Sequence, residues 1–182
     1  MRAVVSVLTV LLFVSTGCGG GDGSGGAAAA PCLSFVGTQA PAAGRVVARL
    51  ATGGSCSARA VEIVVTDVSD VFGAQFTLTF DATKVSYAGA SSQGSFLTSG
   101  GAQVSVQAGN TGSGKVTVGI SRIGVSTGVN VSGSQVLIRL TFAPLAVGSS
   151  SLSMGNAILF GSQTPPQPKP GLTWSGGSFT IQ

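Results

Sequence analysis

The stretch FGAQFTLTFD, from Phe72 to Asp81, carries the most regular pattern in the chain. Apolar and polar residues alternate strictly along it: Phe76, Leu78 and Phe80 against Gln75, Thr77 and Thr79. Successive side chains of a β-strand point to opposite faces of a sheet. The stretch therefore predicts a strand with one face in a core and the other in water.

The same period of two recurs along the rest of the chain. It is found at residues 45–51, 59–68, 84–91, 102–109, 115–123, 135–143, 151–160 and 177–181. No stretch has the period of a soluble helix. About nine short strands in about 140 residues predict an all-β antiparallel sandwich. We expect its core to contain Phe76, Leu78, Phe80, Val104, Val106, Val118, Ile120, Leu140 and Phe142.

Composition supports one folded domain. The chain has 182 residues, of which 43% are hydrophobic and only 8% charged, so it is too apolar for a disordered protein. The 29 glycines suit short strands joined by tight turns. The basic residues are scattered singly, which argues against nucleic-acid binding.

The segment GNTGSGKV, residues 109–116, is one residue away from a phosphate-binding loop. Val116 stands where that motif has a Ser or Thr to hold Mg²⁺. The motif also needs a helix after its Lys, whereas the residues after Lys115 alternate like a strand. We therefore interpret the segment as the turn of a β-hairpin, and we expect no nucleotide or other cofactor.

The N-terminal segment has the pattern of an export signal. Arg2 is followed by the apolar run Ala3–Val14 and by small residues before Cys18. The end of this segment resembles a bacterial lipoprotein signal, which implies that Cys18 is lipidated, although Ser15 departs from the usual Leu. The alternative is an ordinary secretory signal cut nearby.

We therefore expect a signal peptide at 1–17, a lipidated Cys with a flexible tether at 18–31, and a sandwich domain at 32–182. The Gly/Ala-rich tether has a root-mean-square reach of about 20 Å. This organisation predicts an exported protein, anchored to a membrane in the cell envelope or at the cell surface.

The three cysteines fit this organisation. If Cys18 carries lipid, Cys32 and Cys56 remain as an even pair in an oxidising compartment, and we expect them to form a disulfide. The alternatives are two free buried thiols or a two-Cys metal site. The chain has no His to complete such a metal site.

Catalytic chemistry has little support. Without His, no Ser-His-Asp or Cys-His arrangement is possible. The acidic residues are Asp22, Glu62, Asp67, Asp70 and Asp81. Asp67 and Asp70 flank a short loop and fit turn chemistry, with a weak Ca²⁺ site as the alternative, and Asp81 fits a turn. We expect a protein that is not an enzyme.

Two longer stretches, residues 61–97 (VEIVVTDVSDVFGAQFTLTFDATKVSYAGASSQGSFL) and 133–154 (GSQVLIRLTFAPLAVGSSSLSM), resemble a cohesin domain. The likeness rests on the order of an early V-x-I-x-V strand, Phe80-Asp81, Gly94-x-Phe96-Leu97, and a Gly-Ser-Ser-x-Leu strand. It implies a nine-stranded jelly-roll sandwich. The best known cohesins bind dockerin modules and recruit enzymes into complexes that degrade plant polysaccharides.

The resemblance also implies a binding face. It places the strands at 72–80, 102–108, 115–122 and 135–142 on one sheet. The outward positions would be Gln75, Thr77, Thr79, Ser105, Gln107, Thr117, Ser121, Leu137 and Arg139. Arg is a frequent anchor in interfaces, so Arg139 is the expected centre of the face. Unlike well-studied dockerin binders, the face lacks Asp, Asn and exposed aromatic residues.

Two other functions remain open at this point. A carbohydrate-binding lipoprotein would need exposed aromatic side chains on one face, and Tyr87 and Trp174 are the candidates. A structural envelope protein would have no specific ligand. For the docking function we expect a monomer that binds a protein partner and is held at a membrane by its lipid.

Overall fold

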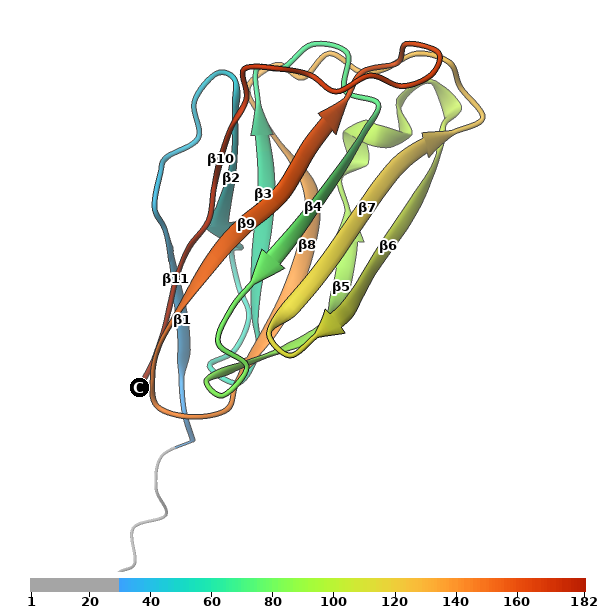
Figure 1. Ribbon diagram of the computed structural model, residues 1–182. Helices are drawn as coiled ribbons and strands as arrows, with labels where there is room; N and C mark the ends of the chain where they lie inside the picture. Colours follow the sequence, from blue (N-terminus) through green and yellow to red (C-terminus); the bar gives the residue numbers. More distant parts are fainter. Residues whose placement is uncertain (1–29) are drawn as a thin grey trace, which may run out of the picture.

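The computed structural model describes residues 30–182, which form a sandwich of two β-sheets (Figure 1). The larger sheet has six strands in the order β1-β11-β9-β4-β7-β6. Their bounds are β1 Leu33–Gly37, β4 Gly73–Thr79, β6 Gln103–Gly112, β7 Lys115–Ile123, β9 Gly148–Phe160 and β11 Gly177–Ile181. In the described part of the chain, no helix has the length and apolar character needed to cross a membrane.

The smaller sheet has five strands in the order β10-β2-β3-β8-β5. Their bounds are β2 Arg45–Leu50, β3 Arg59–Thr66, β5 Val85–Gln93, β8 Ser134–Pro144 and β10 Thr173–Ser175. A short 3-10 helix, η1 at Ser95–Gly101, connects β5 to β6. All strand pairs are antiparallel except β10 with β2, which is parallel.

The predicted all-β sandwich is confirmed, and each of the nine expected strands is present. The sequence pattern missed β1, β10 and η1. The two missed strands are short, with five and three residues.

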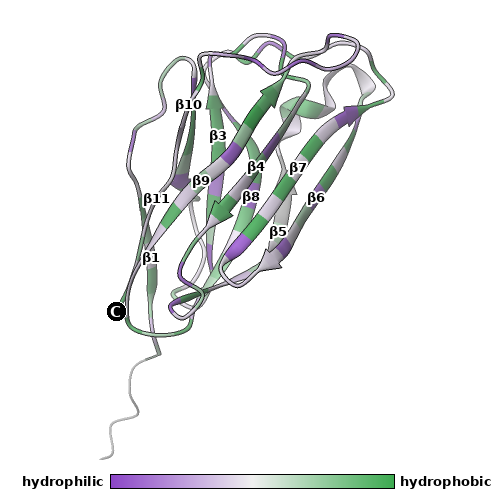
Figure 2. Ribbon diagram, viewed as in Figure 1, coloured by the Kyte–Doolittle hydropathy of each residue, from purple (hydrophilic) through white to green (hydrophobic). Residues whose placement is uncertain are grey.

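The core lies between the sheets and follows the predicted alternation, which Figure 2 shows as green and pale or purple bands along the strands. Seven of the nine expected core residues are buried: Phe76, Leu78, Phe80, Val118, Ile120, Leu140 and Phe142. Val104 and Val106 are only half-buried. They lie on β6, an edge strand that has a paired neighbour on one side only.

Phe142 joins the two sheets through aromatic contacts. Its ring centroid lies 5.5 Å from that of Phe80, 5.0 Å from that of Phe179 and 5.9 Å from that of Tyr87. Phe142 belongs to the smaller sheet, while Phe80 follows β4 and Phe179 lies in β11 of the larger sheet. Tilted and edge-on ring pairs at these distances add to the free energy gained by burial alone.

The segment GNTGSGKV forms the end of β6, the turn and the start of β7, so the hairpin interpretation is confirmed. Gly114 has a φ of +67° in this turn. A Cβ on Gly114 would lie 2.1 Å from the carbonyl oxygen of Phe80. The glycine before Lys115 is therefore required by the turn and by the close approach of the Phe80 backbone.

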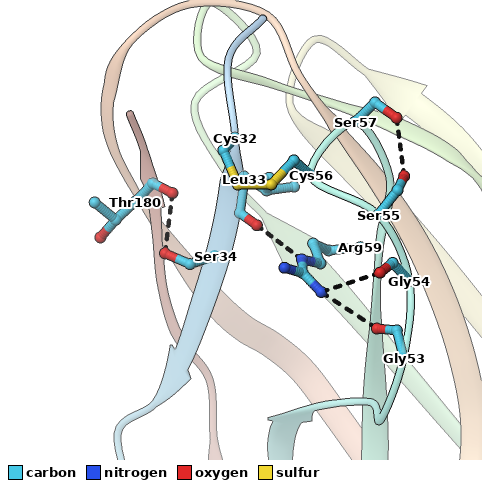
Figure 3. Close-up of a disulfide and its surroundings, with 10 residues drawn as sticks. All are labelled: Cys32, Leu33, Ser34, Gly53, Gly54, Ser55, Cys56, Ser57, Arg59 and Thr180. Carbon is cyan, nitrogen blue, oxygen red and sulfur yellow. Dashed lines mark hydrogen bonds between the residues drawn. A yellow bond between two sulfur atoms is a disulfide. The ribbon is translucent and has the colours of Figure 1, made fainter. Parts of the chain in front are cut away.

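The structure joins Cys32 and Cys56 by a disulfide, with 4.2 Å between their Cα atoms (Figure 3). Arg59 reinforces this end of the sandwich. Its Nε donates to the Leu33 carbonyl at 3.0 Å, and its Nη1 donates to the Gly53 and Gly54 carbonyls at 3.3 and 3.4 Å. The disulfide and the arginine together attach β1 to the loop between β2 and β3.

Removing the disulfide should lower the stability without changing the fold. The Cys32→Ser/Cys56→Ser variant frees a loop whose ends are 24 residues apart. The free energy of unfolding should fall by about 3 kcal/mol, because the unfolded chain regains the entropy of the open loop. Urea denaturation of the wild type and the variant measures the difference. An unchanged midpoint would contradict a stabilising role for this bond.

Candidate functional site

Seven of the predicted site residues lie together on the outer face of the larger sheet. They come from β4, β6 and β7: Gln75, Thr77, Thr79, Ser105, Gln107, Thr117 and Ser121. Each is exposed or half-buried, while their neighbours in sequence on β4 and β7 point into the core. The predicted orientation of these three strands is therefore correct.

The prediction that residues 135–142 belong to the same sheet is wrong. Strand β8 lies in the smaller sheet, between β3 and β5. Arg139 is thus on the opposite side of the sandwich from Thr77 and Thr117, and Leu137 is fully buried next to a β-bulge. Alternation tells which residues share a face of one strand, but it does not tell which sheet the strand joins.

Arg139 belongs to an ion cluster on the smaller sheet. Glu62 of β3 lies between Arg49 of β2 and Arg139 of β8 in one row across the three strands. Glu62 Oε2 accepts a hydrogen bond from Arg49 Nε at 2.8 Å, and Glu62 Oε1 accepts one from Arg139 Nη2. This cluster could not be predicted from the sequence, because the partners of Glu62 are 13 and 77 residues away.

The cluster changes the acidity of Glu62. Burial of the side chain favours its neutral form, but the hydrogen bonds from Arg139 and Arg49, together with their positive charges, outweigh burial. The pKa of Glu62 is therefore held below its usual value. The Arg139 side chain is committed to this contact, so it is not the central anchor of the predicted face.

Strand β9 takes the place that the sequence analysis gave to β8. Four strands, β9, β4, β7 and β6, lie side by side and present one continuous outer face, which we call the docking face (Figure 1). Its residues lie in four rows across the sheet. The rows are Phe160-Gly73-Ser121-Ser105, Ile158-Gln75-Gly119-Gln107, Gly155-Thr77-Thr117-Gly109 and Ser153-Thr79-Lys115-Gly112.

The docking face is hollowed along its middle. One hollow of about 350 Å³ is bordered by Phe72, Phe160 and Pro166, and a second of about 540 Å³ by Thr111 and Thr117. Both hollows share Gln75, Gln107 and Gly119, so they form one continuous depression along β4, β7 and β6. The first hollow is apolar at its rim, and the second is lined by Gln and Thr side chains together with Ala108, Val118 and glycine backbone.

Glycines without a backbone requirement open this depression. Neither Gly109 nor Gly119, which line the second hollow, has a positive φ, and a Cβ on either would have no atom within 4 Å. Glycine inside a strand costs stability relative to a residue with a side chain. Neither a positive φ nor a close neighbour requires glycine at these two positions, which leave the sheet backbone accessible.

The docking face is almost uncharged. Among the sixteen positions of its four rows, only Lys115, at the end of β7, carries a charge. Gln75 and Gln107 are exposed, and neither amide has a hydrogen-bond partner within the described part of the chain. The hydroxyl of Thr117 contacts those of Thr111 and Thr77 at 3.1 and 3.5 Å. The face therefore offers hydrogen bonds and apolar contact rather than ion pairs.

Comparison with known proteins identifies the family. A profile described as "Cohesin domain" matches residues 59–168, which is more than half of the chain. This chain belongs to the cohesin domain family. No curated protein matches its sequence at a significant level.

Solved cohesin structures share this fold. The sixth cohesin of scaffoldin B from Acetivibrio cellulolyticus, solved in complex with a dockerin, is 23% identical, with a TM-score of 0.53 over 66% of this chain and 86% of that one. A type II cohesin from the cellulosome of the same organism is 10% identical, with a TM-score of 0.53 over 83% and 94%. A cohesin module of a Clostridium perfringens family 33 glycoside hydrolase is 11% identical, with a TM-score of 0.50 over 83% and 93%.

Asp67, Asp70 and Asp81 stabilise loops of the described domain. Asp81 Oδ1 accepts hydrogen bonds from the backbone N and the hydroxyl of Thr83 at 2.8 and 2.7 Å, as expected for a turn. Asp67 Oδ1 accepts one from Gly133 N, and Asp70 Oδ2 one from Ser162 N at 3.1 Å. Hydrogen bonding by Ser162 lowers the pKa of Asp70.

The alternative Ca²⁺ site at Asp67 and Asp70 gains no support. Both residues have positive φ values of 47° and 52°, which suits Asp in a turn, and their carboxylates accept hydrogen bonds from loop backbone N–H groups. Within residues 30–182, no three His, Cys, Asp or Glu side chains come together to hold a metal ion.

The two candidate aromatic residues for sugar binding are both partly buried. Trp174 packs against Phe76, with 5.7 Å between ring centroids, and Tyr87 packs against Phe142. Burial raises the pKa of the Tyr87 hydroxyl, which contacts the Ala108 carbonyl at 3.5 Å. No aromatic residue is among the exposed large apolar side chains of residues 30–182, so no flat aromatic platform supports carbohydrate binding.

Cys18, the predicted lipidation site, lies outside the described residues.

The Glu62 cluster predicts a specific dependence of stability on pH. Because the pKa of Glu62 is lower in the folded than in the unfolded state, its contribution is present above the unfolded pKa and is lost as the pH falls through the folded pKa. Glu62→Gln should lower the free energy of unfolding at pH 7 by about 1–2 kcal/mol. The expected loss is modest because both arginines are partly exposed, and solvent weakens their ion pairs with Glu62.

The measurement is the free energy of unfolding of wild type and Glu62→Gln between about pH 7 and pH 3. The wild type should lose more stability than the variant below about pH 5, so the two curves should converge on acidification. Parallel curves would show that Glu62 is not coupled to the arginines.

Proposed function

We propose that this cohesin domain is a non-catalytic docking module that binds a dockerin-type protein partner through its docking face. The observation that carries the proposal is the depression over β4, β7 and β6, which is open because Gly109 and Gly119 lack side chains. A flat sheet with an apolar pocket at one end and free amides beside it suits a protein surface better than a small molecule.

Membership of the cohesin family supports the class of partner. Two solved relatives from Acetivibrio cellulolyticus, the sixth cohesin of scaffoldin B and the third cohesin of a second scaffoldin, were each determined in complex with a dockerin. We infer that the partner of this chain carries a module of that type. By analogy with cellulosomal relatives, we expect that module to belong to a protein of polysaccharide degradation.

The low charge of the docking face indicates what kind of contact surface the partner has. Without carboxylates or arginines in the centre of the face, affinity has to come from apolar burial at Phe160 and Phe72 and from hydrogen bonds to Gln75 and Gln107. We therefore expect the partner to insert an apolar side chain beside Phe160. Because ion pairs contribute little, the affinity should depend weakly on salt.

A side chain that fills the depression should block docking while the fold is preserved. Gly119→Arg places a large group where both hollows meet, and a Cβ at this position has no atom within 4 Å. We expect at least a tenfold loss of affinity for a dockerin-bearing partner, which corresponds to about 1.4 kcal/mol. The melting temperature should change little, because the new side chain points into solvent.

The matched control is Thr141→Arg, which adds the same side chain to an outward, half-buried position of β8 on the opposite sheet. Partner binding, measured by calorimetry or surface plasmon resonance, should be unaffected in this variant. Equal loss in both variants, or full binding by Gly119→Arg, would place the partner elsewhere on the domain.

We further propose that the domain is exported and held at a membrane by a lipid on Cys18. The support is the sequence alone: a basic start at Arg2, the apolar run Ala3–Val14, small residues before Cys18, and a tether rich in Gly and Ala. Such a tether would hold the docking module close to the membrane and leave it free to rotate toward its partner.

The anchor is tested by Cys18→Ser in the full chain. Wild-type protein should sediment with membranes and incorporate radiolabelled palmitate, whereas the variant should do neither. Membrane association that survives the substitution, or a wild type without label, would rule out the lipid anchor. This result is independent of the docking face, because Cys18 lies outside the sandwich domain.

A further inference from the structure

The loop between β8 and β9 exposes two large apolar side chains at one tip. Leu145 is 55% exposed and Val147 is 66% exposed, with Ala146 between them. Figure 2 shows this loop in green at the lower end of the sandwich. Single exposed apolar residues are common, but two on one tip suggest a contact that the domain itself does not supply.

This tip lies at the end of the sandwich where the described chain begins. Leu33 at the start of β1 pairs with Ile181 of β11, which pairs with Gly148 at the start of β9. Two strand spacings, about 10 Å, therefore separate the first strand from the tip. Cys32, just before β1, is hydrogen-bonded to Gln182 at the same end.

The backbone of the loop is held in place on both sides. Leu145 N donates to the Lys84 carbonyl at 2.8 Å, and Lys84 Nζ donates to the Val147 carbonyl at 3.0 Å. These bonds fix the loop to the turn before β5. The apolar side chains are thus presented outward on a supported loop, with the ammonium group of Lys84 beside them.

The charges at this end are mainly positive. Arg59, Lys84 and Lys115 stand at or next to the starts of β3, β5 and β7, all at the lower end in Figure 1. Asp81 is the one acidic residue at this end of the described domain, and its carboxylate accepts hydrogen bonds from Thr83. An apolar tip with the ammonium group of Lys84 beside it, and further cations at the same end, is complementary to an anionic lipid surface.

We propose that Leu145 and Val147 enter the interface of an anionic bilayer, so that this end of the sandwich rests on the membrane. The inference rests on the proposed anchor at Cys18, which would bring this end, rather than the opposite one, to the lipid. The contact is too small to recruit a free protein. A tether with a reach of about 20 Å, however, holds the tip at an effective concentration in the millimolar range.

The contact has a consequence for docking. The strands of the docking face run from the tip end to the far end of the sandwich (Figure 1). A domain that stands on Leu145 and Val147 therefore holds this face upright from the membrane. A partner arriving from solution would then find the depression uncovered by lipid.

The test places a fluorescent reporter at the tip of the mature chain. A hexahistidine tag before residue 19 holds the protein on vesicles that contain a nickel-chelating lipid and about 30% phosphatidylglycerol, so no native lipidation is needed. With Cys32 and Cys56 in their disulfide, Val147→Cys provides one free thiol for an NBD label. The matched control is Ile123→Cys. Ile123 is an exposed apolar residue that ends β7, at the end of the sandwich far from the tip.

We expect the emission of the label at residue 147 to shift to the blue and to gain at least twofold in intensity on these vesicles. The label at residue 123 should have the same spectrum on vesicles as in water. A second substitution, Leu145→Asp, should abolish the shift at 147. Identical spectra at 147 and 123, or a shift that survives Leu145→Asp, would overturn the proposal. Because the tag replaces the lipid, this outcome is separate from the result for Cys18.

Discussion

The packing of Phe142 against both layers of the sandwich is the contact on which the rest of the structure depends. Its ring meets Phe80 and Phe179 of the larger sheet and Tyr87 of its own sheet. Phe179 in turn contacts Phe35, so a chain of aromatic rings extends from β8 to the edge strand β1. Once these rings interdigitate, the register of both sheets is set, because a shift by one residue would turn every core side chain outward.

A core of this kind leaves the two outer faces free to differ. The smaller sheet closes its outer face with the Glu62 cluster, in which one buried carboxylate is shared by two arginines. The larger sheet leaves its face open, with glycines where side chains would have room. Both sheets pack through the same kind of apolar interior, so the core does not account for the difference between their outer faces.

Much of the fold could be predicted from the sequence, because alternation along a strand is local. FGAQFTLTFD showed which side of β4 is buried, and the strand after Lys115 separated a hairpin turn from a phosphate-binding loop. Sheet membership could not be predicted in this way. Strands β8 and β9 both alternate, and the choice between them depends on pairing with β3 or β4, partners that are far away in the chain.

The candidate site shows the same limit. The polar residues of β4, β6 and β7 were identified, because each strand shows its outward positions. The contribution of Phe160 and Ile158 from β9 was missed, and Arg139 was placed on the wrong side. One signal was available: Gly109 and Gly119 interrupt strands that otherwise favour β structure, and glycine inside a strand often marks a close approach to the backbone.

In the proposed complex the partner occupies the outer face of β9, β4, β7 and β6. Hydrogen–deuterium exchange of the domain, alone and saturated with a dockerin-bearing partner, locates the bound surface. Exchange should slow at the edge strand β6 and at the exposed turns next to the depression, around Thr111 and Pro166, while β2, β3 and the Arg49-Glu62-Arg139 row keep their rates. Protection confined to the smaller sheet, with β6 unchanged, would contradict the account.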